Sequence, residues 1–308
     1  MTKGKIAITP RSATKVLHPA LNLISEAGYE LLIPSPGEVP TAEIQNSFAG
    51  EIVGYLAGVE KIDASFLRNA SNLRVISRNG TGIDNIDLIS AEHHGIKVVN
   101  APTANSQGVA ELTIGLIFVG ARNILQSAQG IREGKWERSL GFELSGKTLG
   151  LVGCGQIGQR VALAALGIGM SVTAFDAYPS EKFAPSPHFT FDTLEQVLEN
   201  ADVVSLHCPP SETPIINEAS INMMKVGAIL VNTARASLVE TVAVGKALES
   251  GKLSGYICDV FDPEPPKGFP LVNHPRFIGT SHIGGFTRES VDRAMYQSVE
   301  NLIKALEE

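Results

Sequence analysis

Short apolar runs alternate with amphipathic segments of helical length in the first third of the chain. Runs of about four to eight apolar residues between helical patterns are typical of a parallel sheet with helices on both faces. The expected strands are Lys5–Thr9, Glu30–Ile33, Ile52–Gly54, Leu73–Ser77 and Ile96–Asn100. The expected helices are Ser12–Ala27, which stops at Gly28, then Thr41–Phe48, Ala64–Ala70 and Asp84–His94.

A second series begins near Thr148, and most of its strands are continuous apolar runs, as in strands buried on both faces. The expected strands are Thr148–Gly153, Ser171–Asp176, Val203–His207, Ala228–Thr233, Ser254–Asp259 and Phe277–Ser281. Helices fit between them at Gln156–Gly169, Leu194–Glu199, Glu218–Met224 and Val239–Ser250. The pattern therefore predicts an α/β protein with two doubly wound parallel-sheet domains.

Two further helices complete this organisation. Gln107–Arg122 is apolar throughout, which suggests a helix buried between domains or between subunits. The last helix, Glu289–Leu306, follows the final strand, and we expect the chain to cross back so that its tail packs on the first module. The expected domains are 1–100, completed by 286–308, and 101–285.

Composition narrows the class of protein. At roughly 150 residues per domain, 308 residues suggest two domains. Hydrophobic residues make up 44% and charged residues 19%, which excludes a disordered chain. The net charge of −7 argues against a nucleic-acid partner. The longest apolar stretch, Leu112–Ala121, is about half a membrane span, and no signal peptide is evident. We therefore expect a cytoplasmic protein without membrane contact.

The cysteines and the paired histidines do not predict a metal site. Cys154, Cys208 and Cys258 include no C-x-x-C pair, so we expect three small buried thiols in a reducing compartment. His93 and His94 are adjacent and cannot share a helix face, so we expect both at the solvated surface.

A predicted strand runs into the pattern G-x-G-x-x-G and then into a helix. Gly153 permits a tight turn, Gly155 lets the backbone approach a pyrophosphate, and Gly158 allows close packing of helix on strand. The helix N-terminus adds free N–H groups for the phosphates. Asp176 ends the next strand, where an acceptor for the ribose hydroxyls belongs. A carboxylate repels a 2′-phosphate, so the sequence favours NAD over NADP.

Three polar side chains follow strands of the second series. A nicotinamide enzyme that reduces a keto acid needs a cation for the carboxylate, an acid for the carbonyl oxygen and a partner for that acid. Arg235, Glu264 and His282 supply these types after three predicted strands, where open parallel sheets bind ligands. Each could singly be an ordinary surface or core residue, but their common placement favours a shared site.

With these motifs the chain resembles the D-isomer-specific 2-hydroxyacid dehydrogenases, and the phosphoglycerate-dehydrogenase-like branch is the most similar. The resemblance covers most of the chain. The matching segments are Arg78–Asp87, Asn100–Pro102, Asn105–Ser106, Ala110–Thr113, Gly134–Trp136, Gly146–Thr148, the glycine turn, His207–Pro209, Asn232–Arg235, Asp259–Phe261, Glu264–Pro265 and His282–Gly285.

The resemblance implies roles for individual residues. Arg235 matches the arginine that binds the substrate carboxylate and carbonyl, His282 the proton donor, and Glu264 the acid that pairs with the histidine. The loop that offers N–H groups to the substrate carboxylate is matched by Asn79, Gly80, Thr81 and Gly82. The implied cofactor-binding positions are Gly153, Gly155, Gln156, Ile157, Gly158, Asp176, His207, Pro209, Thr213, Thr233, Ala234, Asp259 and Gly284, with His282 also contacting the cofactor.

The resemblance also implies an architecture. Residues 101–285 would form a Rossmann NAD-binding domain, and 1–100 with 286–308 a flavodoxin-like substrate domain, with the active site in the cleft between them. A homodimer through Asn100–Trp136 is implied, which fits the apolarity of that region. Trp136 is then expected at the dimer interface or in the core rather than stacked on the substrate.

The implied activity is the NAD-dependent interconversion of a 2-hydroxy acid and a 2-keto acid of the phosphoglycerate, glycerate/hydroxypyruvate or glyoxylate type. Enzymes specific for 3-phosphoglycerate tend to carry an extra cation in the loop before Arg78, whereas Val53–Gly58 has none. An unphosphorylated substrate is therefore favoured. The alternatives are an NAD-sensing, corepressor-like binding protein on the same fold and a relative that oxidises formate or phosphonate.

Overall fold

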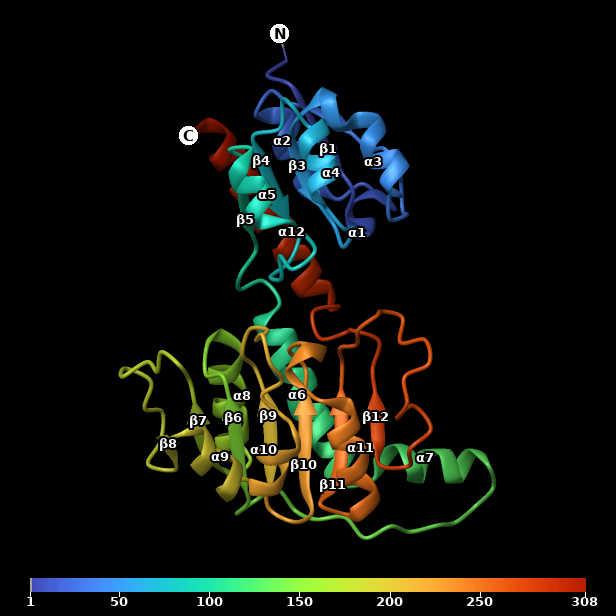
Figure 1. Ribbon diagram of the computed structural model, residues 1–308, viewed down its shortest axis with the longest axis vertical. Coiled ribbons are helices and arrows are strands. Elements are labelled where there is room, and N and C mark those ends of the chain that lie inside the picture. The colour runs from blue at the N-terminus through green and yellow to red at the C-terminus, as the bar shows by residue number, and fades with distance from the viewer. Residues whose placement is uncertain (1) are drawn as a thin grey trace. The chain divides into compact units, whose positions relative to one another are not determined.

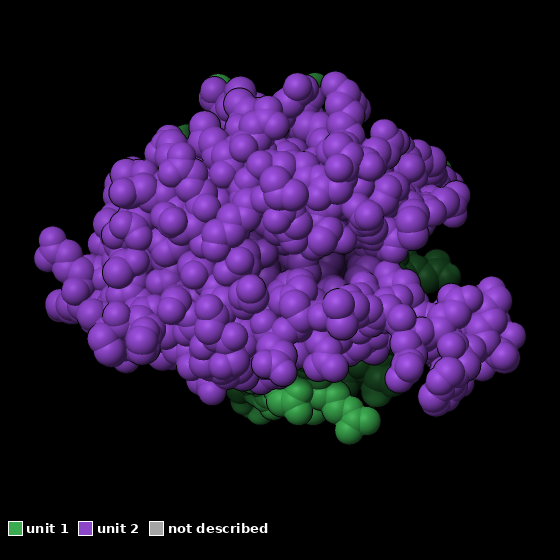
Figure 2. Space-filling view, turned by 90° about the horizontal axis from the view of Figure 1, so that it is seen from below, with its two compact units in different colours: residues 1–105, 287–308 green, residues 106–286 purple. Residues whose placement is uncertain are grey.

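The computed structural model describes residues 2–308, which form two compact units (Figure 1). The first unit runs to Asn105 and includes Thr287–Glu308, and the second is Ser106–Phe286 (Figure 2). The first boundary lies later than the expected residue 100, because Ala101 and Ala104 pack with Ala294 of the last helix.

The first unit contains a five-stranded parallel sheet in the order β2–β1–β3–β4–β5. This is the expected flavodoxin-like order, and its topological switch point lies between β1 and β3. The strands are β1 (Lys5–Ile8), β2 (Glu30–Leu32), β3 (Ile52–Ala57), β4 (Val75–Arg78) and β5 (Lys97–Asn100).

The helices of the first unit cover both faces of this sheet. Phe48, Tyr55 and Phe66 lie in the apolar cluster on one face. The helix α12 (Arg288–Glu307) packs on the other face, where Met295 and Val299 join the core. The expectation that the tail returns to the first module is therefore confirmed. The remaining helices are α1 (Arg11–Thr14), α2 (Asn22–Glu26), α3 (Ala42–Phe48), α4 (Ala64–Asn69) and α5 (Leu88–His93).

The second unit contains a seven-stranded parallel sheet in the order β12–β11–β10–β9–β6–β7–β8. Its winding reverses between β6 and β9, and the order is that of a Rossmann fold with one further strand. The strands are β6 (Thr148–Val152), β7 (Ser171–Phe175), β8 (Phe189–Phe191), β9 (Val203–Leu206), β10 (Ala228–Asn232), β11 (Leu253–Cys258) and β12 (Phe277–Gly279).

Helices enclose this sheet in two separate apolar clusters. One cluster contains residues of α6 (Ser106–Ala121) and α8 (Gln156–Gly167). The other contains residues of α9 (Leu194–Asn200), α10 (Glu218–Met223) and α11 (Thr241–Ser250). Both faces of the sheet are thus buried, which explains the continuous apolar runs of its strands.

The structure corrects several expected elements of the first unit. The single helix expected at 12–27 is α1, a 3₁₀ turn at Pro19–Leu21 and α2, because proline has no N–H to donate and the preceding His18 is extended. Helix α5 begins at Leu88, where the Asp87 carboxylate accepts the Ser90 N–H at 2.9 Å and caps it.

In the second unit, β8 and α7 (Ile124–Arg132) have no counterpart among the expected elements. The helix expected at Gln107–Arg122 is confirmed as α6, but Leu116 and Ile117 are buried in the core of this unit rather than between domains or subunits. Trp136, expected in the core or at a dimer interface, is 80% exposed, so the core position is wrong and the interface position stays a prediction. The chain between α7 and β6 runs past the amino ends of the strands (Figure 1).

Candidate active site

The glycine turn between β6 and α8 has the geometry of a phosphate cradle. Gly153 has φ +95°, and a Cβ there would lie 2.6 Å from backbone atoms of His207 and Cys208. A Cβ on Gly158 would lie 2.3 Å from the Gly153 carbonyl oxygen. No described atom lies within 4 Å of a Cβ built on Gly155. The turn is therefore closely packed on one side and open to a ligand on the other.

The N-terminus of α8 follows this open side. Gly155 is the N-cap and has no side chain to accept the first N–H groups of the helix. Gln156 and Ile157 are the first residues of the helix, so their backbone N–H groups lie where a phosphate can accept them. This arrangement fits the pyrophosphate of a dinucleotide.

Asp176 lies directly after β7 and reaches the same turn. Its Oδ2 accepts the Cys154 N–H at 2.7 Å, and its Oδ1 accepts the Tyr178 N–H at 2.8 Å. Each carboxylate oxygen can accept a second hydrogen bond. The half-buried carboxylate is thus fixed beside the glycine turn with capacity for ribose hydroxyl groups.

His207 ends β9 on the other side of the cradle. Its Nε2 lies 2.9 Å from the Ser205 hydroxyl, and its buried Nδ1 has no hydrogen-bond partner among residues 2–308. Burial lowers the pKa of His207 to about 3, so the imidazole is neutral near pH 7. Pro209 and Thr213, the other predicted contacts of this segment, are exposed on the following loop.

Arg235 follows β10 in a turn that a buried asparagine supports. The Nδ2 of Asn232 donates to the Arg235 carbonyl oxygen at 2.8 Å, and its Oδ1 accepts the Ala234 N–H at 3.0 Å. The Thr233 hydroxyl lies 2.9 Å from that of Thr113 on α6. These roles of Asn232 and Thr113 were not predicted, because both depend on tertiary packing.

His282 and Glu264 form a direct pair. The Nδ1 of His282 lies 2.9 Å from both carboxylate oxygens of Glu264. Because a carboxylate only accepts hydrogen bonds, Nδ1 carries the proton. The Phe261 N–H donates to Glu264 Oε1 at 3.0 Å and fixes the carboxylate. The His282 side chain is 52% exposed, and its Nε2 is directed away from Glu264. The pairing expected from the sequence therefore exists in the structure.

The buried carboxylate of Asp259 holds the loop that carries His282. Its Oδ1 accepts the Thr280 hydroxyl at 2.6 Å and the Ile283 N–H at 2.8 Å, and its Oδ2 accepts the Gly284 N–H at 2.8 Å. His282 lies among these donors with φ +54°, an uncommon conformation for a non-glycine residue. Asp259 thus fixes the backbone of His282, a role that sequence reasoning missed.

The predicted substrate loop lies in the first unit, directly after β4. The Asn79 N–H donates to the Ala57 carbonyl oxygen at 2.8 Å, which ties this loop to the end of β3. The Thr81 hydroxyl donates to Asn105 Oδ1 at 2.8 Å, and Asn100 Nδ2 donates to the Thr81 carbonyl oxygen at 2.6 Å. Gly80 has φ +140°, which requires glycine. Both ends of the loop are therefore held by neighbouring strands.

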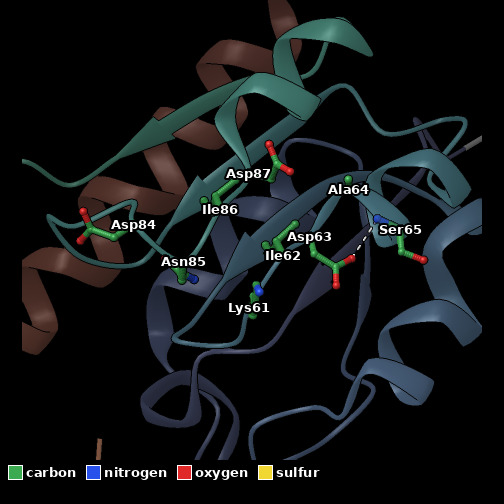
Figure 3. Close-up of a pocket in the computed structure, with 9 residues that line it drawn as sticks. All are labelled: Lys61, Ile62, Asp63, Ala64, Ser65, Asp84, Asn85, Ile86 and Asp87. Carbon is green, nitrogen blue, oxygen red and sulfur yellow. Dashed lines mark hydrogen bonds between the residues drawn. The ribbon is translucent and has the colours of Figure 1, made fainter. Parts of the chain in front are cut away.

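A separate cavity of about 400 Å³ lies in the first unit (Figure 3). Asp63 and Asp87 on its wall cap α4 and α5, and Figure 3 shows the Asp63 carboxylate accepting the Ser65 N–H. Lys61 is the one basic residue among those that line the cavity. No residue predicted for catalysis or substrate binding lines this cavity, so we do not assign it to the active site.

The surroundings of the three cysteines favour the neutral thiol over the thiolate. Burial raises the pKa of Cys154 and of Cys258 to about 12, and that of Cys208 to about 11. Cys154 and Cys258 are buried as expected, but Cys208 is only half-buried because it lies at the start of the loop after β9. His93 and His94 are exposed, as expected.

Within residues 2–308, no three His, Cys, Asp or Glu side chains are grouped as metal ligands. No single helix of the described chain is long and apolar enough to cross a membrane. Among residues 2–308, only α6 and α7 taken together have the length and composition of a broken span, with a 67° bend between them.

Comparison with known proteins agrees with this geometry. Residues 114–284, more than half of the chain, match the D-isomer specific 2-hydroxyacid dehydrogenase, NAD binding domain. The chain is 41% identical over 253 residues to hydroxypyruvate reductase of Thermotoga maritima, which covers 80% of this chain and 82% of that protein. It is also 41% identical over 251 residues to D-3-phosphoglycerate dehydrogenase of Methanocaldococcus jannaschii, which covers 80% of this chain and 48% of that protein. The chain thus spans about half the length of this phosphoglycerate dehydrogenase.

Solved structures share the fold along almost the whole chain. The TT0316 protein of Thermus thermophilus has a TM-score of 0.87 at 37% identity, covering 98% of this chain and 97% of that one. NAD⁺-bound 3-phosphoglycerate dehydrogenase of Entamoeba histolytica has a TM-score of 0.82 at 27% identity, covering 98% and 94%. The second unit is the NAD-binding domain of this fold, with NAD as its cofactor. The chain therefore belongs to the D-isomer specific 2-hydroxyacid dehydrogenase family.

Proposed function

We propose that the chain is an NAD-dependent dehydrogenase that interconverts a 2-hydroxy acid and a 2-keto acid. The observation that carries this proposal is the His282–Glu264 pair, which lies in the same unit as a glycine turn that fits a dinucleotide. The names of the relatives from Thermotoga maritima and Methanocaldococcus jannaschii support the same class of substrate.

The proposed roles follow from the chemistry of the three side chains. The planar guanidinium of Arg235 binds the substrate carboxylate in a bidentate manner. His282 donates a proton from Nε2 to the carbonyl oxygen during reduction and takes it back during oxidation. Glu264 stabilises the charged imidazole through Nδ1 and orients the ring. NAD, when bound, supplies or accepts the hydride.

The cofactor would be held by the second unit. In this proposal the glycine turn and the first N–H groups of α8 bind the pyrophosphate, and Asp176 accepts the ribose hydroxyls. The contacts carried over by resemblance at His207, Pro209, Thr213, Thr233, Ala234, Asp259 and Gly284 belong to the same proposal.

The first unit would act as the substrate domain. The Asn79–Gly82 loop has backbone N–H groups at the carboxyl edge of its sheet, where doubly wound folds bind ligands. The N–H groups of Asn79 and Gly80 already donate to the Ala57 and Arg78 carbonyl oxygens, so we expect those of Thr81 and Gly82 to donate to the carboxylate of the keto acid. The expected cytoplasmic location and the lack of a nucleic-acid partner stay predictions.

A homodimer is part of the proposal. Large apolar side chains are exposed on and near α7: Ile124 (44%), Leu125 (50%), Ile131 (56%) and Trp136 (80%). A second copy of the chain would bury them. Trp136→Asp should convert a dimer into a monomer in sedimentation experiments, whereas Val226→Asp, at a site that is 82% exposed elsewhere, should not. A wild-type monomer would contradict this part.

A purely NAD-sensing protein is not favoured, because such a role does not require a proton donor paired with a carboxylate. The two relatives named above are a dehydrogenase and a reductase, not binding proteins by name. An oxidiser of formate or phosphonate is not favoured either, since neither reaction protonates a carbonyl oxygen.

The test is NADH oxidation with a panel of 2-keto acids: glyoxylate, hydroxypyruvate and longer members. Arg235→Ala should lower kcat/KM about 10²- to 10³-fold, the usual loss for a charge-stabilising donor in a closed site. Arg235→Lys should recover only part of it, and Arg68→Ala, on the exposed surface of α4, should change nothing. NADH binding should survive in all three variants. Near-normal turnover by Arg235→Ala would overturn the assignment.

A further inference from the structure

Glu60 is a buried carboxylate that the proposed reaction does not use. The residue is 4% exposed and lies just after β3. Its Oε1 accepts the Tyr55 hydroxyl at 2.9 Å, the Gly58 N–H at 2.9 Å and the hydroxyl of Thr9. Its Oε2 is buried without a hydrogen-bond partner among residues 2–308. A carboxylate in this state needs an explanation, because burying an acceptor without a partner costs stability.

Glu60 lies at the topological switch point of the first unit. Thr9 directly follows β1 and Gly58 directly follows β3, the two strands between which the winding of the sheet reverses. Glu60 joins these two strand ends through its Oε1. In doubly wound sheets the crevice at this point is where ligands bind. The carboxylate therefore places a fixed negative charge at the ligand-binding edge of this unit.

The proposed substrate loop is the immediate neighbour of Glu60. The Ala57 carbonyl oxygen accepts the Asn79 N–H, and the N–H of the same peptide group, which belongs to Gly58, donates to Glu60. The Nδ2 of Asn85, after the same loop, donates to the Glu60 carbonyl oxygen at 2.6 Å. The charge of Glu60 and the N–H groups expected to hold the substrate are thus parts of one hydrogen-bonded edge.

Three donors converge on one oxygen of Glu60 and fix the position of its carboxyl group. Burial, followed by the charge of Glu60, raises the pKa of Tyr55, so the phenol stays a donor. The charge acts through a poorly hydrated region, where electrostatic interactions are stronger than in water.

We propose that Glu60 determines the substrate class. Its charge would exclude 2-keto acids that carry a second anionic group at the end away from the carboxylate, so that the accepted substrates are uncharged apart from that carboxylate. The proposal rests on the function proposed above. A binding site can gain specificity from a charge that repels the wrong ligand. A phosphate ester would bring its dianion toward Glu60, whereas a hydroxyl or alkyl group would not.

The test compares two acids that differ only by a terminal phosphate, hydroxypyruvate and phosphohydroxypyruvate, in NADH-dependent reduction. The wild-type chain should favour hydroxypyruvate in kcat/KM. Glu60→Gln, which keeps the shape but removes the charge, should raise the ratio for the phosphorylated acid at least about fivefold, as expected when a like charge is removed from a poorly hydrated site. Glu51→Gln is the matched control, because Glu51 precedes the same strand at its opposite end, paired with Lys5.

A second variant covers the case in which Glu60→Gln does not fold. Val59→Lys adds a cation beside Glu60 at a position that is 65% exposed, and it should also raise the ratio, whereas Val59→Met should not. A loss of activity toward both acids with an unchanged ratio would mean that Glu60 is only structural and would overturn this inference alone. A wild-type chain that reduces no 2-keto acid of the panel would overturn the proposed function and this inference with it, whereas activity on other members of the panel but on neither of these two acids would overturn this inference alone.

Discussion

The Nδ1 of His282 lies 2.9 Å from both carboxylate oxygens of Glu264, although the two residues come from loops after different strands. Glu264 is fixed by the Phe261 N–H, and His282 by the Asp259 carboxylate next to it in the fold. Each member of the pair therefore has its own support. Such support is expected for an imidazole that must be oriented to donate a proton.

Asp259 should act as a positioning residue. Asp259→Asn leaves one oxygen for the Thr280 hydroxyl and the Ile283 N–H, but its amide nitrogen cannot accept the Gly284 N–H. We expect a loss of about 1–3 kcal/mol in the free energy of unfolding, the usual cost of a buried donor without its partner. We also expect kcat to fall.

The matched control for this variant is Asp262→Asn, an exposed carboxylate three residues further along. Urea unfolding and steady-state kinetics on both variants provide the measurement. If Asp259→Asn kept wild-type kcat, the conformation of His282 would not depend on Asp259.

Asp176 should decide between the two nicotinamide cofactors. Its carboxylate is fixed at the glycine turn by the Cys154 N–H and would repel a 2′-phosphate. The unmodified chain should prefer NADH to NADPH by at least about tenfold in kcat/KM, or about 1.4 kcal/mol. Asp176→Ala should narrow this preference. Equal use of both cofactors by the unmodified chain would refute the assignment of Asp176.

His207 should make folding sensitive to acid. Burial lowers its pKa to about 3 in the folded chain, whereas the reference value is 6.5. Between these two values the unfolded chain binds a proton that the folded chain does not, so stability falls as pH drops below about 6.5. From pH 7 to pH 5 this residue alone should account for up to about 2 kcal/mol.

Urea unfolding of His207→Gln at both pH values measures this contribution. The variant should lose less stability on acidification than the wild type, whatever its stability at pH 7. His94→Gln, at an exposed site, should behave as the wild type does. The same pH dependence in wild type and His207→Gln would show that the imidazole is hydrated in the folded state.

The sequence predicted those features that depend on short segments. The glycine turn is one, because its three glycines and Asp176 lie within one β-α-β segment with fixed spacing. Continuous apolar strands likewise predicted a sheet covered on both faces. Pro19 lies within the periodic segment at 12–27, and a proline inside a helical pattern is itself a local signal that the helix breaks there.

Features that depend on distant contacts were not predictable. Asn232 and Asp259 lie in segments that match the family, but their hydrogen-bonding roles, like that of Glu60, appear only when other strand ends lie beside them. Strand β8 has three residues and gives too short a pattern to distinguish from a loop. Thr113 is 120 residues from the threonine whose hydroxyl it contacts.

The most direct test is the pH profile of kcat/KM for NADH-dependent reduction of hydroxypyruvate by wild type, His282→Ala and Glu264→Gln. The wild type should be active at low pH and lose activity as pH rises, because the proton donor is then deprotonated. His282→Ala should abolish this limb and lower the rate about 10²- to 10⁴-fold. Glu264→Gln keeps a hydrogen-bond partner for Nδ1 of His282 but removes the charge, so it should lower the rate less than His282→Ala does. A wild-type profile in His282→Ala would contradict the central claim that His282 is the proton donor.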